Sequence, residues 1–328
     1  METCLQEISV TSLAPLRIGQ IEDAEAGTGV TVLLCPDGMG AGIDIRGGGP
    51  ASRETPLLNP LMAAGTIHAV VLGGGSAFGL DAAGGVMVYL EEKDIGYPVG
   101  VTRVPLVVQT DLFDLTVGDP FVRPDKAMGY AAAKAALEAP NYRDGNFGAG
   151  CGATVGKLMG MSRCMKSGIG SYAVQLGELK VGAVVAVNAY GDIYDPETGR
   201  QIAGLLNESR DGLASTQEGM LADIRAKENR FTGNTTIGVI ITNAVFNKAS
   251  LSKIAGMGHD GLARTIRPVH TSVDGDSLFA VSIGSLKADQ DLVGILAADA
   301  VANAVLRAVR HTESAFGYPS VSELFPGT

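Results

Sequence analysis

The sequence predicts an α+β layered sandwich, with helices on the outside and sheets on the inside. Strand-like and helix-like segments each occur in groups, and regular strand–helix–strand alternation is not sustained along the 328 residues. Hydrophobic residues make up 46% of the chain and charged residues 18%, which is ample material for a core. The 45 glycines lie between apolar segments, so they indicate tight turns and close backbone contacts, not disorder. We expect one domain over residues 1–328.

The first half of the chain alternates short apolar runs with glycine-rich turns. Its strongest helix signal is a Pro-Asp cap at residues 124–125, which leads into an alanine-rich run. In chain order we expect a strand at 30–35, a glycine-rich turn at 40–49, a strand at 68–72, a helix at 77–93, a strand segment at 98–108, and a helix at 124–138.

The second half predicts a meander of strands followed by the longest helix. That helix has Leu292, Leu296 and Val305 on one side, interrupted only by the charge of Asp299. In chain order we expect a glycine-rich loop at 148–157, strands at 169–176, 179–188 and 193–195, a surface helix at 214–227, a strand at 236–242, a helix at 248–266, a strand at 279–285, and a helix at 289–311.

Composition excludes several classes of protein. The formal net charge is -10 without a basic cluster, which argues against a nucleic-acid partner. The four cysteines show no CxxC spacing, so buried free thiols are expected in place of disulfides or a zinc site. The first residues lack the basic and apolar regions of a signal peptide, and no apolar run reaches 18 residues. We therefore expect a soluble, cytoplasmic protein that spans no membrane.

The most informative segment is 233–242, where a polar Asn-Thr-Thr stretch enters a strand of Ile and Val. Just ahead of it, residues 211–230 are charged and polar, so an exposed segment is expected to end at a buried strand. This layout suits a chain that cuts itself before Thr235, because an amino-terminal threonine can use its own amine as the base for its hydroxyl. Thr236 is the rival nucleophile, although its side chain would face the other way. Alternatively, both threonines simply favour a strand.

The glycine-rich run 73–79 follows a strand and precedes a helix. It has Phe78 where a dinucleotide-binding loop needs its third glycine and where a nucleophile elbow needs its last one. The run is therefore either a tight turn that lets the helix approach the sheet, or part of a substrate pocket built by Gly74, Gly75 and Ser76. The four histidines are scattered and have no metal-binding spacing; a Ser-His-Asp hydrolase stays open, although nothing marks its serine.

Each of four further polar residues has an interpretation that involves no catalytic role. Asp274 and Asp276 alternate around a glycine, so they could hold a threonine hydroxyl and a new ammonium, or form a solvated turn; composition alone favours the turn. Lys157 ends a glycine-rich loop and could be a surface side chain that covers apolar neighbours. Asn188 ends an apolar strand and could be a turn residue or an amide donor to an oxyanion.

Seven segments in collinear order resemble the DmpA-like aminopeptidase family of self-processing amidases. This family includes L-aminopeptidase/D-esterases, β-aminopeptidases and nylon-oligomer hydrolases, and the resemblance extends over residues 18–309. The segments are 44–48, 53–55, 70–82, 124–129, 150–157, 234–236 and 274–280. The resemblance implies a four-layer αββα sandwich like that of amino-terminal nucleophile hydrolases, with different connectivity. It also implies self-cleavage into an α fragment, 1–234, and a β fragment, 235–328, which stay together in a homo-oligomer, often a tetramer.

The same resemblance assigns roles to residues. The scissile bond would be Asn234–Thr235, with Thr235 as the nucleophile. Lys157 and Asn188 match positions that line the site in the nylon-oligomer branch, and Asp274 and Asp276 match the acidic pair around the nucleophile. Phe113 stands where some relatives have a tyrosine, which puts transfer of their aminopeptidase specificity in doubt.

These observations predict an amide hydrolase that acts on short peptides or oligoamides through an acyl-enzyme. The Thr235 amine or Lys157 would be the base, Asn188 and nearby backbone N–H groups would hold the oxyanion, and no metal or organic cofactor would be required. The alternatives are an acyltransferase of related self-cleaving fold and an uncleaved, non-catalytic binding protein. L-, D- and β-amino-acid amides and aminohexanoate oligomers all remain open as substrates.

Overall fold

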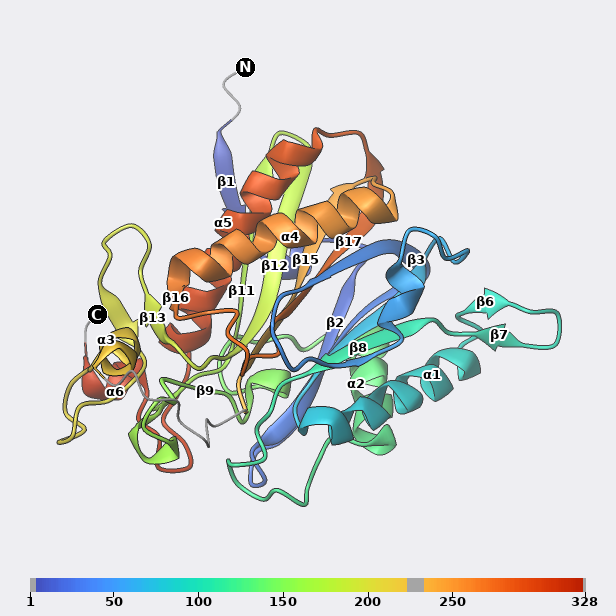
Figure 1. Ribbon diagram of the computed structural model, residues 1–328. Helices are drawn as coiled ribbons and strands as arrows, with labels where there is room; N and C mark the ends of the chain where they lie inside the picture. The colour runs from blue at the N-terminus through green and yellow to red at the C-terminus, as the bar shows by residue number, and fades with distance from the viewer. Residues whose placement is uncertain (1–3, 223–232, 327–328) are drawn as a thin grey trace.

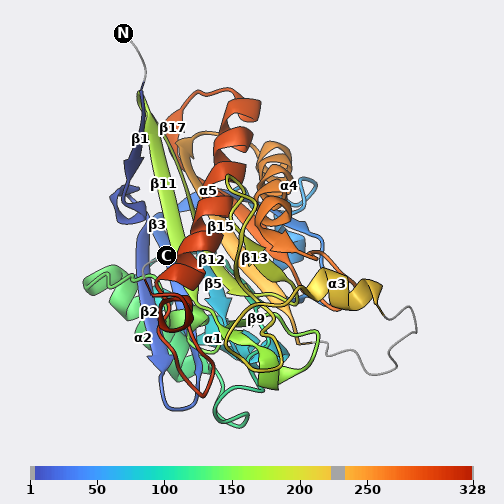
Figure 2. The same ribbon diagram turned by 90° about the vertical axis from the view of Figure 1, so that its left-hand side faces the viewer.

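The chain folds into four layers, in the order helices, sheet, sheet, helices (Figures 1 and 2). The computed structural model describes residues 4–222 and 233–326. The long strand β3 (Thr28–Ile45) belongs to both sheets, because its first half pairs with β2 and β5 and its second half with β17. The pairing register is irregular between Leu34 and Met39, which is where such a strand can bend from one layer to the next.

Each sheet contains one parallel pair of strands. In the first sheet β15 and β17 are parallel, and in the second β5 and β8 are parallel, whereas the other pairs are antiparallel. The first sheet has the order β1 (Leu5–Ile8), β11 (Ile169–Leu176), β12 (Leu179–Asn188), β15 (Thr235–Ala244), β17 (Ser277–Leu286) and the second half of β3. The second sheet has the order β2 (Arg17–Asp23), the first half of β3, β5 (Ile67–Gly73), β8 (Val107–Asp111) and β4 (Ala51–Arg53).

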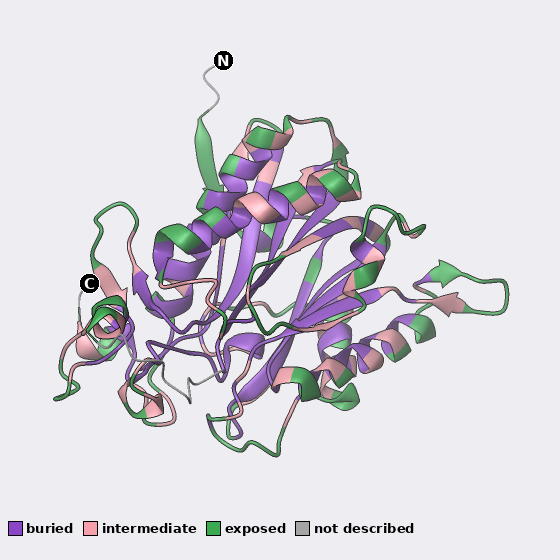
Figure 3. Cartoon of the chain, viewed as in Figure 1, coloured by how far each residue is buried: buried purple, intermediate pink, exposed green. Residues whose placement is uncertain are grey.

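Each sheet has a pair of helices on its outer face, and three hydrophobic clusters fill the three interfaces (Figure 3). Helices α4 (Lys248–Thr265) and α5 (Gln290–Arg310) cover the first sheet, and α1 (Ala82–Glu92) and α2 (Lys126–Glu138) cover the second. Side chains alternate along the strands as a pleated sheet requires. In β15, for example, Ile237 and Val239 face the other sheet, whereas Ile240 faces the helices. The predicted four-layer αββα sandwich is confirmed.

The turn predicted at 40–49 is wrong for its first six residues. Residues 40–45 of the expected turn at 40–49 continue β3 and pair with β17. Glycine in this strand allows α4 to pack closely, because a Cβ atom on Gly42 would lie 2.3 Å from the backbone nitrogen of Ser252 in α4. The sequence showed the glycines, but not the helix that packs against them.

Four other expected elements differ in extent or pairing. The predicted strand at 98–108 is a hairpin, β6 (Tyr97–Pro98) and β7 (Arg103–Val104), followed by β8. The predicted helix at 77–93 begins as a 3-10 turn, Ser76–Asp81, and becomes α-helical at Ala82. Strand β13 (Asp192–Tyr194) does not continue the meander, because it pairs with β14 (Gln201–Ala203) and β16 (Ile266–Arg267) in a separate sheet. The predicted helix at 214–227 is α3 (Thr216–Leu221), and residues 223–227 lie outside the described part of the chain.

Helix α5 is long and apolar enough, by length and composition, to cross a membrane. However, 72% of its most apolar window is buried inside the structure, where it packs on β11, β12 and α4. Its apolar character is therefore that of a core helix. All four cysteines carry free thiols; Cys35, Cys151 and Cys164 are buried, as expected, and Cys4 is exposed.

Helices α1 and α2 approach each other closely because glycines lie where they meet. A Cβ atom on Gly85 would lie 1.8 Å from the Lys126 carbonyl oxygen, and one on Gly129 would lie 1.9 Å from the Ala82 carbonyl oxygen. By contrast, a Cβ on the adjacent Gly84 would have the flexible Lys126 side chain as its nearest neighbour, at 3.1 Å.

We expect Gly85→Ala to lower the free energy of unfolding by about 1–3 kcal/mol, because the two helices must move apart. Gly84→Ala, one residue earlier in the same helix, should be neutral or stabilising by up to about 1 kcal/mol, since alanine is the better helix former. Urea denaturation of both variants measures the difference. Equal stabilities would show that close helix contact does not determine the residue at position 85.

Candidate functional site

Thr235 is the first residue of β15, in the interior of the first sheet. It pairs with Asn188 of β12, and the preceding residue, Asn234, forms a parallel bridge with Asp274. Its side chain is buried, with 4% exposed, and its Oγ1 donates a hydrogen bond to the carbonyl oxygen of Asn234. The hydroxyl therefore lies against the carbonyl group of the peptide bond that precedes its own residue.

The Asn234 carbonyl oxygen has a second donor. The backbone N–H of Gly275 bonds to it, with a nitrogen–oxygen distance of 2.9 Å. Only glycine fits there, because a Cβ atom on Gly275 would lie 2.8 Å from Thr235 Oγ1 and 2.9 Å from the Gly49 carbonyl oxygen. A fixed N–H group at this carbonyl is the type of donor that stabilises an oxyanion.

Lys157 is buried, with 1% exposed, so the alternative of a surface lysine is wrong. Its Nζ donates to the Asn188 carbonyl oxygen at 3.0 Å, to the Asn188 Oδ1 at 2.6 Å and to the Gly233 carbonyl oxygen at 3.0 Å. Burial lowers the pKa of Lys157 to about 7, although the negative charges of Asp274 and Asp114 oppose that shift. A lysine with a pKa near neutrality can exchange a proton at working pH.

The side-chain amide of Asn188 connects four parts of the site. Its Oδ1 accepts from the Thr154 N–H at 3.0 Å and from Lys157. Its Nδ2 donates to the carbonyl oxygens of Phe113, at 2.7 Å, and Gly233, at 3.3 Å. Both the oxygen and the nitrogen of this amide are thus engaged with neighbours, and Phe113 takes part through its backbone carbonyl.

The two carboxylates are buried, so the alternative of a solvated turn is wrong; Asp274 is 2% exposed and Asp276 is 1% exposed. Asp276 Oδ1 accepts from the backbone N–H of Thr236 at 2.7 Å. Asp274 Oδ2 accepts from the N–H of Thr271 at 2.8 Å and from its hydroxyl at 2.5 Å. Burial raises the pKa of Asp274, and the neighbouring charge of Asp276 raises it further. Through its bond to the Thr236 N–H, Asp276 holds strand β15 one residue after Thr235.

The glycine-rich turn at 73–79 wraps around a buried aspartate. The N–H of Gly75 donates to Asp114 Oδ1 at 2.7 Å, and a Cβ atom on Gly74 would lie 1.9 Å from Asp114 Oδ2. Ser76 follows with a positive φ of 54°. The tight-turn interpretation is therefore correct for the backbone. The turn meets the site through Asp114, which follows Phe113, and its share in a substrate pocket stays a prediction.

Sequence reasoning missed three residues at or beside this site. Asp114 lies three residues after the end of β8, and burial raises its pKa to about 6. His270 binds Asp276 through its ring Nδ1 at 2.9 Å, and its position six residues ahead of that aspartate was the only available signal. Lys166 is fully buried, and its neighbours in the sequence gave no hint of its partners.

Lys166 holds the glycine-rich loop that leads to Lys157. Its Nζ donates to the carbonyl oxygens of Gly150, at 3.3 Å, Ala153, at 3.1 Å, and Ser167, at 2.5 Å. Burial lowers the pKa of Lys166 to about 7. The loop 148–157 is thus fixed from inside by one lysine and ends at another.

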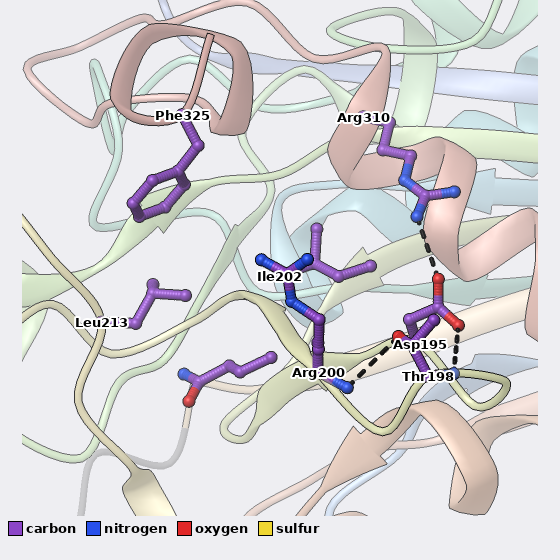
Figure 4. A pocket seen from close by; sticks show the side chains of 8 residues that line it. Asp195, Thr198, Arg200, Ile202, Leu213, Arg310 and Phe325 are labelled. Carbon is purple, nitrogen blue, oxygen red and sulfur yellow. Dashed lines mark hydrogen bonds and ion pairs between the residues drawn. The ribbon is translucent and has the colours of Figure 1, made fainter. Parts of the chain in front are cut away.

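A separate pocket of about 550 Å³ lies at the end of α5, and none of the predicted site residues lines it. Figure 4 shows Arg310 directed at Asp195 on one side and the apolar side chains of Phe325 and Leu213 on the other. Within residues 4–222 and 233–326, no group of three or more His, Cys, Asp or Glu side chains is arranged to hold a metal ion.

Comparison with known proteins identifies one family. Residues 9–321 match the sequence model of peptidase family S58. The chain is 38% identical to the uncharacterized aminopeptidase ML1167 of Mycobacterium leprae, over 97% of this chain and 94% of that protein. It is 30% identical to the 6-aminohexanoate-oligomer endohydrolase of Kocuria sp. (strain KY2), over 89% of this chain and 83% of that protein.

The fold has solved counterparts. One is the L-aminopeptidase D-Ala-esterase/amidase of Ochrobactrum anthropi, with a TM-score of 0.66 and 17% sequence identity, over 93% of this chain and 86% of that chain. That structure is described as a new variant of the Ntn hydrolase fold. The predicted resemblance to amino-terminal nucleophile hydrolases is therefore confirmed at the level of the fold.

The two buried lysines predict that the protein gains stability above neutral pH. The ordinary pKa of 10.5 falls to about 7 for both Lys157 and Lys166 in the folded chain. Between these values the unfolded chain binds more protons, so the free energy of unfolding rises with pH, by at most about 1.4 kcal/mol per unit for each lysine. Urea denaturation at pH 7, 8 and 9 measures this slope, and Lys166→Met should reduce it.

The exposed Lys253 provides the matched control, because Lys253→Met should leave the slope unchanged. Stability that is flat or falling between pH 7 and 9 would contradict the expected effect of burial on these two ammonium groups.

Proposed function

The chain belongs to peptidase family S58, the family of DmpA-like aminopeptidases that its motifs resemble, and is a hydrolase of peptide or other linear amide bonds; from this premise we propose that it activates itself by cutting the Asn234–Thr235 bond. Thr235 then serves as an amino-terminal nucleophile. The observation that carries this proposal is the hydrogen bond from the Thr235 hydroxyl to the Asn234 carbonyl oxygen, which the Gly275 N–H also binds.

The first step is an N-to-O shift. The Thr235 oxygen attacks the Asn234 carbonyl carbon while a base takes the hydroxyl proton, and the proton passes to the departing Thr235 nitrogen. The Gly275 N–H supports the oxyanion, a type of donor whose loss typically costs about 2.7–4 kcal/mol in the barrier. The shift thus frees the Thr235 amine, and water then opens the Asn234 ester, which gives a carboxyl group on Asn234 and restores the Thr235 hydroxyl.

The pairing of the strands supports continued association of the two fragments. β15 begins the β fragment and is hydrogen-bonded to β12 of the α fragment, and β17 is hydrogen-bonded to β3. Cutting the chain before Thr235 breaks no strand of the sheet. The fragments 1–234 and 235–328 therefore stay joined along these two strand pairs, along the pair of β13 with β16, and across the helix–sheet core.

In the mature enzyme, Thr235 attacks a substrate amide and the leaving amine takes a proton, which gives an acyl-enzyme that water hydrolyses. The Thr235 amine or Lys157 is the base. Asn188 holds Lys157 in place, and Asp276 fixes the strand through the Thr236 N–H. The relatives named as an aminopeptidase and as an oligoamide endohydrolase support short peptides or linear oligoamides as the substrate class.

We expect the purified protein to contain two fragments under denaturing conditions. The mass of 33.7 kDa divides in proportion to 234 and 94 of the 328 residues, so the fragments should weigh about 24 and about 10 kDa, with Thr235 as the new terminus. Thr235→Ala should remain a single chain, because it lacks the attacking hydroxyl. Intact-mass spectrometry measures both.

Thr236→Val is the matched control, since it removes the neighbouring buried hydroxyl and keeps the backbone N–H that Asp276 binds. It should still be cut. A wild-type protein that stays at 33.7 kDa after long incubation would contradict self-activation and favour a non-catalytic binding protein.

The two candidate bases predict different pH profiles. If Lys157 is the base, hydrolysis by the mature enzyme rises as pH passes through about 7, because the lysine must lose its proton first. This rise of the rate near pH 7 should be absent in Lys157→Met. If that variant is not cut, it is assayed as a refolded mixture of separately produced fragments. If the rate of Lys157→Met still rises with pH, but around pH 7.7–8.0, the Thr235 amine is the base.

A further inference from the structure

His270 binds the carboxylate that holds the strand of the nucleophile. Its backbone N–H and its ring Nδ1 both donate to Asp276 Oδ2, at 3.1 and 2.9 Å. The other oxygen of this carboxylate, Oδ1, accepts from the N–H of Thr236 at 2.7 Å. One carboxylate thus connects His270 to the residue that directly follows Thr235.

The backbone of His270 is set for this double contact. Its φ of 57° lies in the left-handed region, which few residues other than glycine adopt. Such conformations persist where the surrounding structure determines them, and they concentrate at functional sites. Here the conformation allows the main chain and the side chain of one residue to reach the same oxygen of Asp276.

A second histidine fixes the ring of His270 from the side. The rings of His259 and His270 pack edge to face, with 4.7 Å between their centroids and an interplanar angle of 70°. His259 lies in α4, and its Nε2 donates to the carbonyl oxygen of Asp44 at 3.0 Å. Burial lowers the pKa of His259 to about 4, so this ring is neutral at working pH. The His270 side chain is 16% exposed and has an uncharged neighbour that limits its rotation.

We propose that His270 is a positioning residue: it aims Asp276 at the Thr236 N–H and thereby sets the Thr235 hydroxyl against the carbonyl that it attacks. This inference rests on the proposed function and adds a residue to its machinery. His270 touches no reacting atom and transfers no proton. Its effect is geometric, and displacement of a reacting group by about 1 Å can reduce a rate about 100-fold.

Substitutions at position 270 can distinguish the effect of the ring N–H donor from the effect of the backbone conformation. Glycine adopts a positive φ freely but has no side-chain donor, whereas asparagine tolerates a positive φ and carries an N–H group close to the place of Nδ1. We expect His270→Gly to slow self-cleavage by about 10- to 100-fold and to lower kcat by a similar factor with KM unchanged. His270→Asn should stay within about threefold of the wild type in both.

The experiment follows the appearance of the two fragments by mass after cell-free synthesis, and then steady-state hydrolysis of a chromogenic amino-acid amide by the mature protein. His311→Gly is the matched control, because His311 forms a similar pair at the surface, 3.5 Å from Asp144, and its side chain is 52% exposed. It should behave like the wild type. Thermal unfolding of each variant shows whether the protein is folded.

Three outcomes would overturn the proposal: His270→Gly cuts itself as fast as the wild type, His270→Asn is as slow as His270→Gly, or KM rises while kcat is unchanged. If His270→Gly does not fold, His270→Asp replaces it, since aspartate has the shape of asparagine without the donor. Equal rates for His270→Asp and His270→Asn would then overturn it. A wild type that never cuts itself would instead contradict the proposed function.

Discussion

The site depends on the pairing register of β15. Because β15 lies between an antiparallel and a parallel neighbour, its start is fixed on both sides, with Thr235 opposite Asn188 and with Asn234 bridged to Asp274. A shift of one residue would turn the Thr235 side chain to the opposite face of the sheet and bring Thr236 into its place. The apolar side chains that follow, which alternate between the two cores, oppose that shift. The packing of the strand therefore determines which threonine meets the Asn234 carbonyl.

The same packing buries ionisable groups that would be costly without partners. Unpaired charges in a core are strongly unfavourable, so buried charged groups need hydrogen-bonding partners. At this site the partners are mainly backbone groups: carbonyl oxygens for Lys157 and Lys166, and N–H groups for Asp114 and Asp276. Backbone can come this close only where the side chain is missing, as at Gly275. Many of the glycines in this sequence are thus explained by contact, and fewer by turns.

The sequence was informative where one local signal was enough. Hydrophobic runs predicted β12, β15 and β17, and the polar stretch before an apolar run drew attention to Thr235. Prediction failed where the deciding partner comes from elsewhere in the chain. Gly40 and Gly42 were interpreted as part of a turn because α4, which packs against them, is about 210 residues away in sequence. Asp-Gly-Asp at 274–276 favoured a solvated turn because nothing local shows that β15 and β3 bury it. His270 could be recognised only after the fold had brought it to Asp276.

The order of events constrains the choice of base in the proposed mechanism. Before the cut, the Thr235 nitrogen is part of a peptide bond and cannot accept a proton, so another group must take the hydroxyl proton in the first step. In the proposed mechanism Lys157 is the candidate for this first base, because its Nζ binds the Gly233 carbonyl two residues ahead of Thr235 and burial lowers its pKa to about 7. After the cut, the new amine lies on the same residue as the nucleophile and competes with the lysine. In the proposed mechanism one site thus uses Lys157 to create its second base, and which of the two bases acts depends on whether the Asn234–Thr235 bond is intact.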